Sequence, residues 1–572
     1  MSATSRNGRA PRVLVIGLDG ATFRWITPLV ESGRLPTLAR LMREGASGPL
    51  ESIIPPHTGP AWPSMITGRN PGKHGIFYFE KYDVAKYACL DGIATAEPLV
   101  GRTIFDIASA GGQRVAALRV PMTFPAWPVN GVMASGYPAP GETDRYAYPT
   151  TLASVLPPMA AIRIHGNTPE GTFTHMQREI EVLTTAACQL LTTDQYDLFM
   201  VVYQQTDQAH HFFWRYVDPA SPLYQEREAK LYGDLIARCY EAVDAAAARL
   251  LEFAGDETLV LLVSDHGAEC APATYFQTNR WLADIDLLHA TPHAAEAGLR
   301  RLFDLRHAVS KDLRVKVRKL VMRSSVNGLR SVVNLLGQDS LGIDWSRTAA
   351  YRFPVTEQME GIAINLRGRQ PQGIVEPGTE YEQLLERLTK ELGRLREPGT
   401  DRPLVVEVHR RDEVFWGPHA HRAPDLFYRL APGFESRGEV TGPRFTPVPA
   451  VALERHNAWH DRAGVLMARG PAVVARKRIV GAHLLDIAPT ILRTLGLPLS
   501  GELDGTPLQA CLGTVTPTDA DLPLPVDRME SAFAADADRS PEDNIPLPVS
   551  ASQLSDEEEE SIKGRLRALG YL

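Results

Sequence analysis

The sequence predicts a doubly wound α/β protein built on a mostly parallel sheet, and three observations lead to this prediction. Short apolar runs that end at turns are typical of strands buried on both faces. Helical patterns lie between these runs, and such alternation gives a parallel sheet with helices on both sides. A chain of 572 residues, 44% of them hydrophobic and 22% charged, is long enough for a large core of this kind.

The predicted core elements follow one another along the chain in a regular order. The first strand is RVLVIGLD, and each later apolar run is separated from the one before it by helical sequence. Parallel strands are expected at 12–19, 198–207, 258–267 and 464–470, and the clearest helices at 31–44 and 226–254.

Other parts of the chain depart from this pattern. Between residues 299 and 330 there are ten basic residues against two acidic ones, which indicates the solvated face of a helical lid or, as alternatives, anion steering or membrane-surface contact. Ser555 and Glu558 have the spacing of a capping box, so a helix should begin there. We expect a catalytic domain at 10–270 and 436–512, a basic helical insertion or lid at 271–355, a small α/β cap at 356–435, a flexible arm at 513–555 and a C-terminal helix at 556–572.

Charge and cysteine content exclude several classes of function. A net charge of −8 argues against binding of duplex nucleic acid, which needs a basic surface. No run of about 18 apolar residues occurs, so no transmembrane helix is expected. The cysteines are scattered without a CxxC pair and indicate reduced thiols in a cytoplasmic protein: Cys89, Cys188, Cys239, Cys270 and Cys511.

Three of the four predicted strands end in aspartate, at Asp19, Asp207 and Asp265. In an open α/β sheet, ligands bind outside the carboxyl ends of the strands, so these carboxylates could converge. Each one alone is a weak signal, because an aspartate after a strand is more often part of a turn.

Histidines next to these aspartates strengthen the signal. His211 lies four residues after Asp207, which places both on one face of a helix, and His266 follows Asp265 directly. His460 precedes the last predicted strand. Carboxylate and imidazole ligands together favour zinc, with manganese or magnesium as alternatives.

The stretch PPHTGPAWPSMITGRNPGKHG, residues 55–75, predicts a short helix that begins with Thr58 as its cap. Pro60 suits its first turn and Gly68 its end. Amides at such a helix start can bind phosphate oxygens. Thr58 could also serve only as a helix cap. His57 and His74 are expected in turns or behind the ligands, and Trp62 in the core, rather than as ligands or as a base-stacking platform.

Taken in order, these motifs resemble the alkaline phosphatase superfamily, in its branch of type I phosphodiesterases and nucleotide pyrophosphatases. The resemblance covers Arg12 to about Leu512, and its anchors are GLDG, the stretch around Thr58, TDQAHHFFW, VSDHG, WHDRAGVLMARGP and DIAPTILRTLGLPLSGELDG. It implies two divalent metal ions and a covalent phospho-threonine intermediate. One metal is implied for Asp207, His211 and His460, and the other for Asp19, Asp265, His266 and Thr58, with Thr58 also the nucleophile.

The chain departs from that branch at Phe79, where related nucleotide pyrophosphatases carry an asparagine that holds a phosphate oxygen. The chain is also similar to uncharacterised bacterial phosphohydrolase and phosphomutase-like members, which share PMTFPAWPVNGVMASGYPAP and the tail GRLRALGYL. A phosphomonoesterase or phosphomutase acting on a small metabolite therefore stays open, as does a silent binding protein. The missing donor could come from Gly59, Asn70, Lys73, Arg367 or Arg369.

Overall fold

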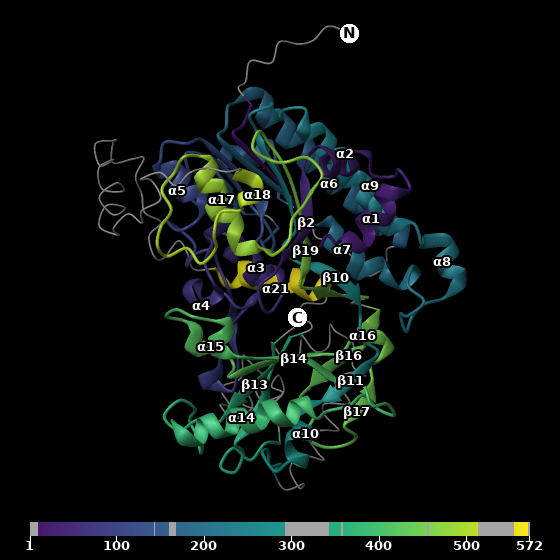
Figure 1. Cartoon of the computed structure of the whole chain (residues 1–572), viewed down its shortest axis with the longest axis vertical. Coiled ribbons are helices and arrows are strands. Elements are labelled where there is room, and N and C mark those ends of the chain that lie inside the picture. The colour runs from purple at the N-terminus through teal and green to yellow at the C-terminus, as the bar shows by residue number, and fades with distance from the viewer. Residues whose placement is uncertain are drawn as a thin grey trace.

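The structure is a computed structural model in which the chain forms two lobes (Figure 1). It describes residues 10–141, 143–158, 168–291, 342–355, 359–454, 457–512 and 554–569. Most of the predicted basic insertion and of the predicted arm lies outside these residues. Within the described residues, no helix has the length and apolar character needed to cross a membrane.

The larger lobe is built on a ten-stranded, mostly parallel sheet, as the sequence predicts. Along the sheet the order is β20-β2-β19-β9-β1-β8-β5-β6-β7, with β21 paired to β2. The strands are β1 (Val13–Leu18), β2 (Ala46–Glu51), β5 (Val115–Val120), β6 (Gly131–Ser135), β7 (Ala147–Tyr148), β8 (Leu198–Tyr203), β9 (Leu259–Val263), β19 (Ala463–Arg469), β20 (Lys477–Arg478) and β21 (Ala482–His483).

Helices cover both faces of this sheet (Figure 1). One layer consists of α1 (Phe23–Glu31), α2 (Pro36–Glu44), α6 (Pro169–Thr193), α7 (Gln205–Phe213) and α9 (Leu235–Leu251), with α8 (Glu226–Tyr232) at its edge. The opposite layer consists of α3 (Thr58–Thr67), α5 (Ile104–Ala110), α17 (Ile487–Thr494) and α18 (Gln509–Leu512). The strands between the layers are apolar because both of their faces are covered, and every residue of β1, β5 and β8 is buried.

Two predicted helices are each two helices in the structure. Residues 31–44 contain the end of α1, a turn in which Gly33 has a φ of +76°, and then α2, which begins at Pro36. Residues 226–254 are divided at Gly233 into α8 and α9. Glycine in a left-handed conformation and proline at a first helical position explain the first division.

One predicted strand has the wrong direction. The run at 464–470, expected to be parallel, forms β19, which is antiparallel to both β9 and β2. The chain enters β19 from the carboxyl edge of the parallel strands, because β18 (Ala458–Asp461) pairs with β10 (Gly267–Cys270) just outside β9. The residues before β19 therefore lie at the same edge as the residues after β9.

The smaller lobe is built on antiparallel sheet (Figure 1). Its four-stranded sheet has the order β12-β13-β15-β14, with α14 against β14 and α10 against β12, and a three-stranded sheet has the order β16-β11-β17. The elements are β11 (Thr274–Gln277), β12 (Ala350–Phe353), β13 (Met359–Ile364), β14 (Val405–Arg410), β15 (Leu426–Leu430), β16 (Phe434–Arg437), β17 (Phe445–Pro447), α10 (Thr278–Asp284), α14 (Thr379–Gly393), α15 (Arg411–Val414) and α16 (Ala450–Leu453). The predicted domain boundaries stay a proposal.

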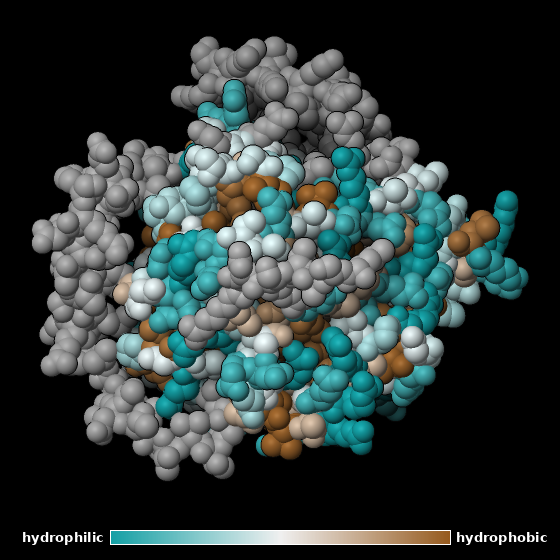
Figure 2. Space-filling model, turned by 90° about the horizontal axis from the view of Figure 1, so that it is seen from above, coloured by the Kyte–Doolittle hydropathy of each residue, from teal (hydrophilic) through white to brown (hydrophobic). Residues whose placement is uncertain are grey.

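The C-terminal helix α21 (Asp556–Leu569) returns to the larger lobe and packs against β4 (Ala88–Ile93), the partner of β3 (Glu80–Asp83). Its predicted capping box is present, since Ser555 and Glu558 bond to each other's backbone amides at 2.9 and 3.2 Å. On the face seen in Figure 2, the hydrophobic side chains lie in small groups among hydrophilic ones, which is ordinary for a protein surface.

Burial of His74 predicts a measurable effect of pH on stability. His74 ends α4 (Pro71–His74), with Nε2 2.9 Å from Ser64 Oγ and Nδ1 accepting a bond from Ile76 N–H. Burial, helped by His419 and Arg69, lowers the pKa of His74 to about 3. An unfolded histidine titrates near 6.5, so below that pH only the unfolded chain takes up the proton, and stability falls by about 1.4 kcal/mol per pH unit.

We expect the wild-type melting temperature to exceed that of His74→Gln at pH 7.5, and this difference to shrink at pH 5, where glutamine has no proton to take up. The control is His421→Gln, which removes an exposed histidine in place of a buried one. A wild-type advantage that stays constant between pH 7.5 and pH 5 would contradict the buried neutral state of His74.

Candidate active site

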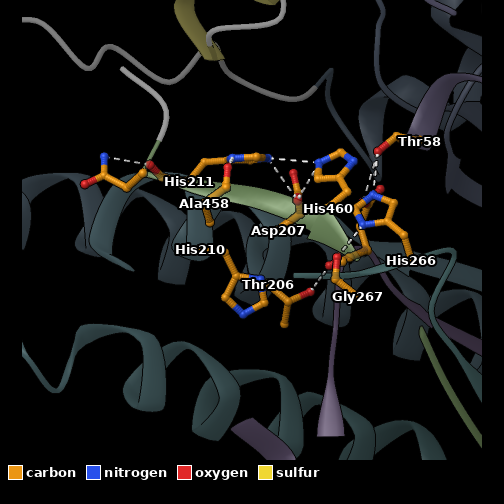
Figure 3. A network of polar contacts seen from close by, with 12 residues as sticks. Thr58, Thr206, Asp207, His210, His211, His266, Gly267, Ala458 and His460 are labelled. Atoms are coloured by element: carbon orange, nitrogen blue, oxygen red, sulfur yellow. Dashed lines mark hydrogen bonds and ion pairs between the residues drawn. The ribbon is translucent and has the colours of Figure 1, made fainter. Parts of the chain in front are cut away.

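The predicted ligands meet at the carboxyl edge of the parallel strands (Figure 3). Asp19 follows β1, and Asp265 and His266 follow β9. Asp207 and His211 lie on α7 directly after β8, which is the helical i, i+4 arrangement expected from the sequence. Thr58 is the first residue of α3, and His460 lies in β18. The fold therefore brings together all seven residues, and all are buried.

His211, His460 and Asp207 form one group. The Nε2 atoms of the two histidines are 3.1 Å apart, and they lie 3.1 and 3.5 Å from Asp207 Oδ1. Each Nδ1 atom lies 3.0 Å from a backbone carbonyl, that of Ala458 for His211 and that of Pro56 for His460. Because a carbonyl only accepts hydrogen bonds, Nδ1 carries the hydrogen and the Nε2 lone pairs face one another.

The second group surrounds the Thr58 hydroxyl. Thr58 Oγ1 lies 3.3 Å from Asp19 Oδ1 and 3.2 Å from His266 Nε2. His266 Nε2 is 3.3 Å from Asp265 Oδ2 and 3.5 Å from Asp19 Oδ1, and its Nδ1 bonds to the Gly267 carbonyl. The rings of His266 and His460 are stacked with centroids 3.6 Å apart, so the two groups adjoin.

Electrostatics at this edge are unfavourable without a cation. Burial, together with Asp265 and Asp207, raises the pKa of Asp19 well above its usual range, and burial also raises the pKa of Asp265. Burial raises the pKa of Asp207 too, but when the rings of His211 and His460 are protonated, their charge outweighs burial and holds that pKa well below its usual range. Three carboxylates buried together repel one another and lose hydration.

These donors fit divalent metal ions. Ligand atoms of Asp19, Asp265 and His266 lie within 4.8 Å of one another, as do those of Asp207, His266 and His460. Asp265 Oδ2 is buried and accepts no hydrogen bond. Imidazole lone pairs and carboxylate oxygens that converge in this way, each imidazole held by a carbonyl at its other nitrogen, are the usual surroundings of such an ion.

The start of α3 differs from the prediction in one respect. The helix cap is His57, not Thr58: its backbone is extended and its Nδ1 accepts a bond from Gly59 N–H at 3.0 Å. The Thr58 side chain is thereby left to face Asp19 and His266. Gly68 ends the helix, as predicted, and has the left-handed conformation. The amides that were expected to bind phosphate are partly engaged, since Pro60 has none and Ala61 N–H bonds to the His57 carbonyl.

Trp62 has a contact that sequence reasoning missed. Its ring is fully buried, in agreement with a packing role, and its Nε1–H also donates to Asp19 Oδ2 at 3.0 Å. Trp62 lies one helical turn after Thr58, so the i, i+4 spacing was the available signal. Thr206 Oγ1 donates to the Asp19 carbonyl at 2.5 Å, which holds the same turn from the other side.

The structure gives the predicted substrate contacts other partners. Asn70 caps α4 through Gly72 N–H and donates to the Val414 carbonyl. The ion-pair partners of the charged residues are Asp504 for Lys73, Glu376 for Arg367 and Asp425 for Arg369. Gly59 N–H likewise already bonds to His57 Nδ1. Their substrate roles stay a prediction.

Comparison with solved structures identifies proteins of similar architecture. Phosphonoacetate hydrolase from Sinorhizobium meliloti, in complex with phosphonoacetate, is 14% identical with a TM-score of 0.47, over 85% of this chain and 96% of that one. Human ectonucleotide pyrophosphatase/phosphodiesterase 5 is 12% identical with a TM-score of 0.43, over 86% of this chain and 97% of that one. No match is found among curated protein sequences.

A sequence model of a protein family matches most of the chain. The model of the family described as type I phosphodiesterase / nucleotide pyrophosphatase matches residues 13–460. This range includes both ligand groups, Thr58 and the whole of the smaller lobe's four-stranded sheet. The chain therefore belongs to the type I phosphodiesterase / nucleotide pyrophosphatase family, metal-dependent phosphoric ester hydrolases of the alkaline phosphatase superfamily.

Proposed function

We propose that this phosphoesterase uses two metal ions and a threonine nucleophile to act on small phosphorylated substrates, with phosphodiesters as the first candidate. The position of Thr58 carries the proposal. Its hydroxyl is buried at the start of α3 between Asp19 Oδ1 and His266 Nε2, at 3.3 and 3.2 Å.

In this proposal each of the two groups of side chains holds one metal ion. Asp207, His211 and His460 would hold one ion, and Asp19, Asp265, His266 and Thr58 the other. Two such ions supply Lewis-acid charge that lowers the pKa of a coordinated hydroxyl or water and neutralises a phosphoryl group. Imidazole and carboxylate donors favour zinc, with manganese and magnesium as alternatives.

The chain's own residues then account for the chemistry. Thr58 Oγ1 attacks phosphorus in line with the leaving oxygen, so that a P–Oγ1 bond forms as the ester bond breaks, and the hydroxyl proton ends on the leaving alcohol. Water next attacks the phosphothreonine, the P–Oγ1 bond breaks, and a proton returns to Thr58. Trp62 and Thr206 keep Asp19 in place through both steps.

Composition supports two further parts of the proposal. A net charge of −8 fits a small substrate rather than duplex nucleic acid. A cytoplasmic location is proposed because the described cysteines are free thiols, as expected in a reducing compartment: Cys188, Cys239, Cys270 and Cys511.

Phe79 favours a second candidate function. Its ring is fully buried and lies 4.7 Å from the His57 ring, so an apolar group stands near Thr58 where related pyrophosphatases carry an amide. A phosphomonoesterase or phosphomutase therefore remains the alternative.

Replacing Thr58 tests the nucleophile. Thr58→Ala should lose turnover by several orders of magnitude, because no phosphothreonine can form. Thr58→Ser keeps the hydroxyl and should retain much of the rate. Thr67→Ala is a matched control, since Thr67 is a buried threonine of the same helix whose hydroxyl bonds only to the Pro63 carbonyl. Acid quench followed by peptide mass mapping should place the phosphoryl group on Thr58.

Near-normal turnover of Thr58→Ala, or an adduct on another residue, would instead indicate direct attack by water. A wild-type protein that binds two metal ions but neither forms an adduct nor releases product would be the silent binding protein.

Substrate choice is tested by comparing bis-p-nitrophenyl phosphate with p-nitrophenyl phosphate, with Thr58→Ala as the blank. The first candidate predicts the higher kcat/KM for the diester. A higher value for the monoester would replace it by the phosphomonoesterase, and transfer of phosphate to an added alcohol without free phosphate would identify a mutase.

A further inference from the structure

The start of α3 offers few backbone hydrogen-bond donors to the oxygens of a phosphoryl group bound at Thr58. At the start of α3, Gly59 N–H bonds to His57, Pro60 has no N–H, and Ala61 N–H bonds to the His57 carbonyl. Phe79 packs directly against this helix start, since a Cβ on Gly59 would lie 3.2 Å from Phe79 N. The phenyl side chain has no hydrogen-bond donor. Phosphoryl transfer needs fixed donors, because negative charge develops on these oxygens.

Tyr137 is a polar side chain that packs against Phe79. Its ring meets the Phe79 ring edge to face with centroids 5.5 Å apart, and Phe79 in turn lies 4.7 Å from His57, whose ring is 5.6 Å from that of the ligand His460. Tyr137 follows β6, two strands from β8, so it emerges at the same carboxyl edge as Asp207. It is only 4% exposed.

The charges around Tyr137 come from two sides. Asp19 and Asp207 act on its hydroxyl from the ligand groups, and Arg565 acts on it from α21. Burial, only partly opposed by Arg565, raises the pKa of Tyr137 well above its usual range, so the hydroxyl keeps its hydrogen at neutral pH. A protonated phenol is a hydrogen-bond donor.

Helix α21 is docked on the segment that carries Tyr137. Glu558 accepts bonds from Arg145 Nη1 at 2.7 Å and from Thr143 Oγ1 at 3.4 Å. A Cβ on Gly141 would lie 3.0 Å from Arg565 Nη2, so the guanidinium lies directly against this segment. Ile562 and Leu566 are buried on the same helix. The docking of α21 therefore brings Arg565 against the segment after β6 that carries Tyr137.

We propose that Tyr137 is a catalytic hydrogen-bond donor to the substrate's phosphoryl group, and that Arg565 of α21 acts through Tyr137 as a positioning residue. This inference rests on the proposed function, because it assigns a role within the same phosphoryl transfer. The proposal gives the C-terminal helix α21 a part in catalysis. No residue of this helix is among the proposed metal ligands.

Tyr137→Phe removes the donor and keeps the ring. Loss of one such donor typically lowers kcat by about 10²-fold or more, and we expect this loss with an unchanged melting temperature, unchanged metal content and weaker inhibition by vanadate. Tyr146→Phe is the matched control and should keep kcat. Tyr146 is equally buried, and the charged groups that act most strongly on it are Arg119, Glu179 and Arg565.

Arg565→Met tests the positioning role, with Arg565→Lys as the conservative variant and Lys563→Met as the control on the same helix. We expect Arg565→Met to lower kcat by about 10-fold, as is common for a group behind a catalytic one, and Arg565→Lys to recover most of the loss. Combined with Tyr137→Phe, Arg565→Met should add little, because both variants remove one interaction.

The outcomes separate this inference from the proposed function. If wild type forms the Thr58 adduct and Tyr137→Phe keeps its kcat and its vanadate inhibition within about twofold of the wild-type values, Tyr137 is not a donor. If the loss of kcat in the double variant is the product of the two single losses, Arg565 does not act through Tyr137. If wild type forms no adduct on Thr58, the proposed function fails and this inference with it.

Discussion

Burial of three carboxylates and three imidazoles at one edge of a sheet is the constraint on which the rest of this structure depends. Asp19, Asp207 and Asp265 are buried close together, and burial, with repulsion between carboxylates as a smaller cause, raises the pKa values of Asp19 and Asp265. The histidines cannot turn away, because each is tied to a backbone carbonyl through Nδ1. Such an arrangement favours bound cations, and it places the Thr58 hydroxyl among the candidate ligands.

This constraint also explains how the smaller lobe is attached. The chain leaves the sheet immediately after His266 through β10 and returns through β18, and the register pairs Ala268 with His460. The lobe is therefore inserted between two candidate ligands, one from each of the two groups of side chains. The antiparallel direction of β19 follows from this return, because the chain must re-enter the sheet from the edge at which His460 is needed. The C-terminal helix reaches the same edge from another side, through the segment after β6.

Much of the site could be predicted from the sequence because its signals are local. The aspartates directly follow apolar strands, His211 and His266 stand at short spacings from them, and Thr58 opens a helix with a recognisable end at Gly68.

Features that depend on distant contacts could not be predicted. The Trp62–Asp19 bond joins residues 43 apart and the Arg145–Glu558 pair residues 413 apart. Strand direction failed for 464–470 because an apolar run carries no information on the edge from which the chain enters. The cap of α3 was misassigned by one residue because histidine is not a usual capping residue.

The central claim is that two metal ions sit side by side around Thr58, and anomalous diffraction tests it most directly. Crystals of the full chain, prepared without chelator and with vanadate present, would be measured at the absorption edge of the metal that X-ray fluorescence identifies. We predict two anomalous peaks about 4 Å apart, one among Asp207, His211 and His460 and the other among Asp19, Asp265 and His266, with vanadium bonded to Thr58 Oγ1. A single peak, or two peaks with vanadate held away from Thr58, would contradict the account.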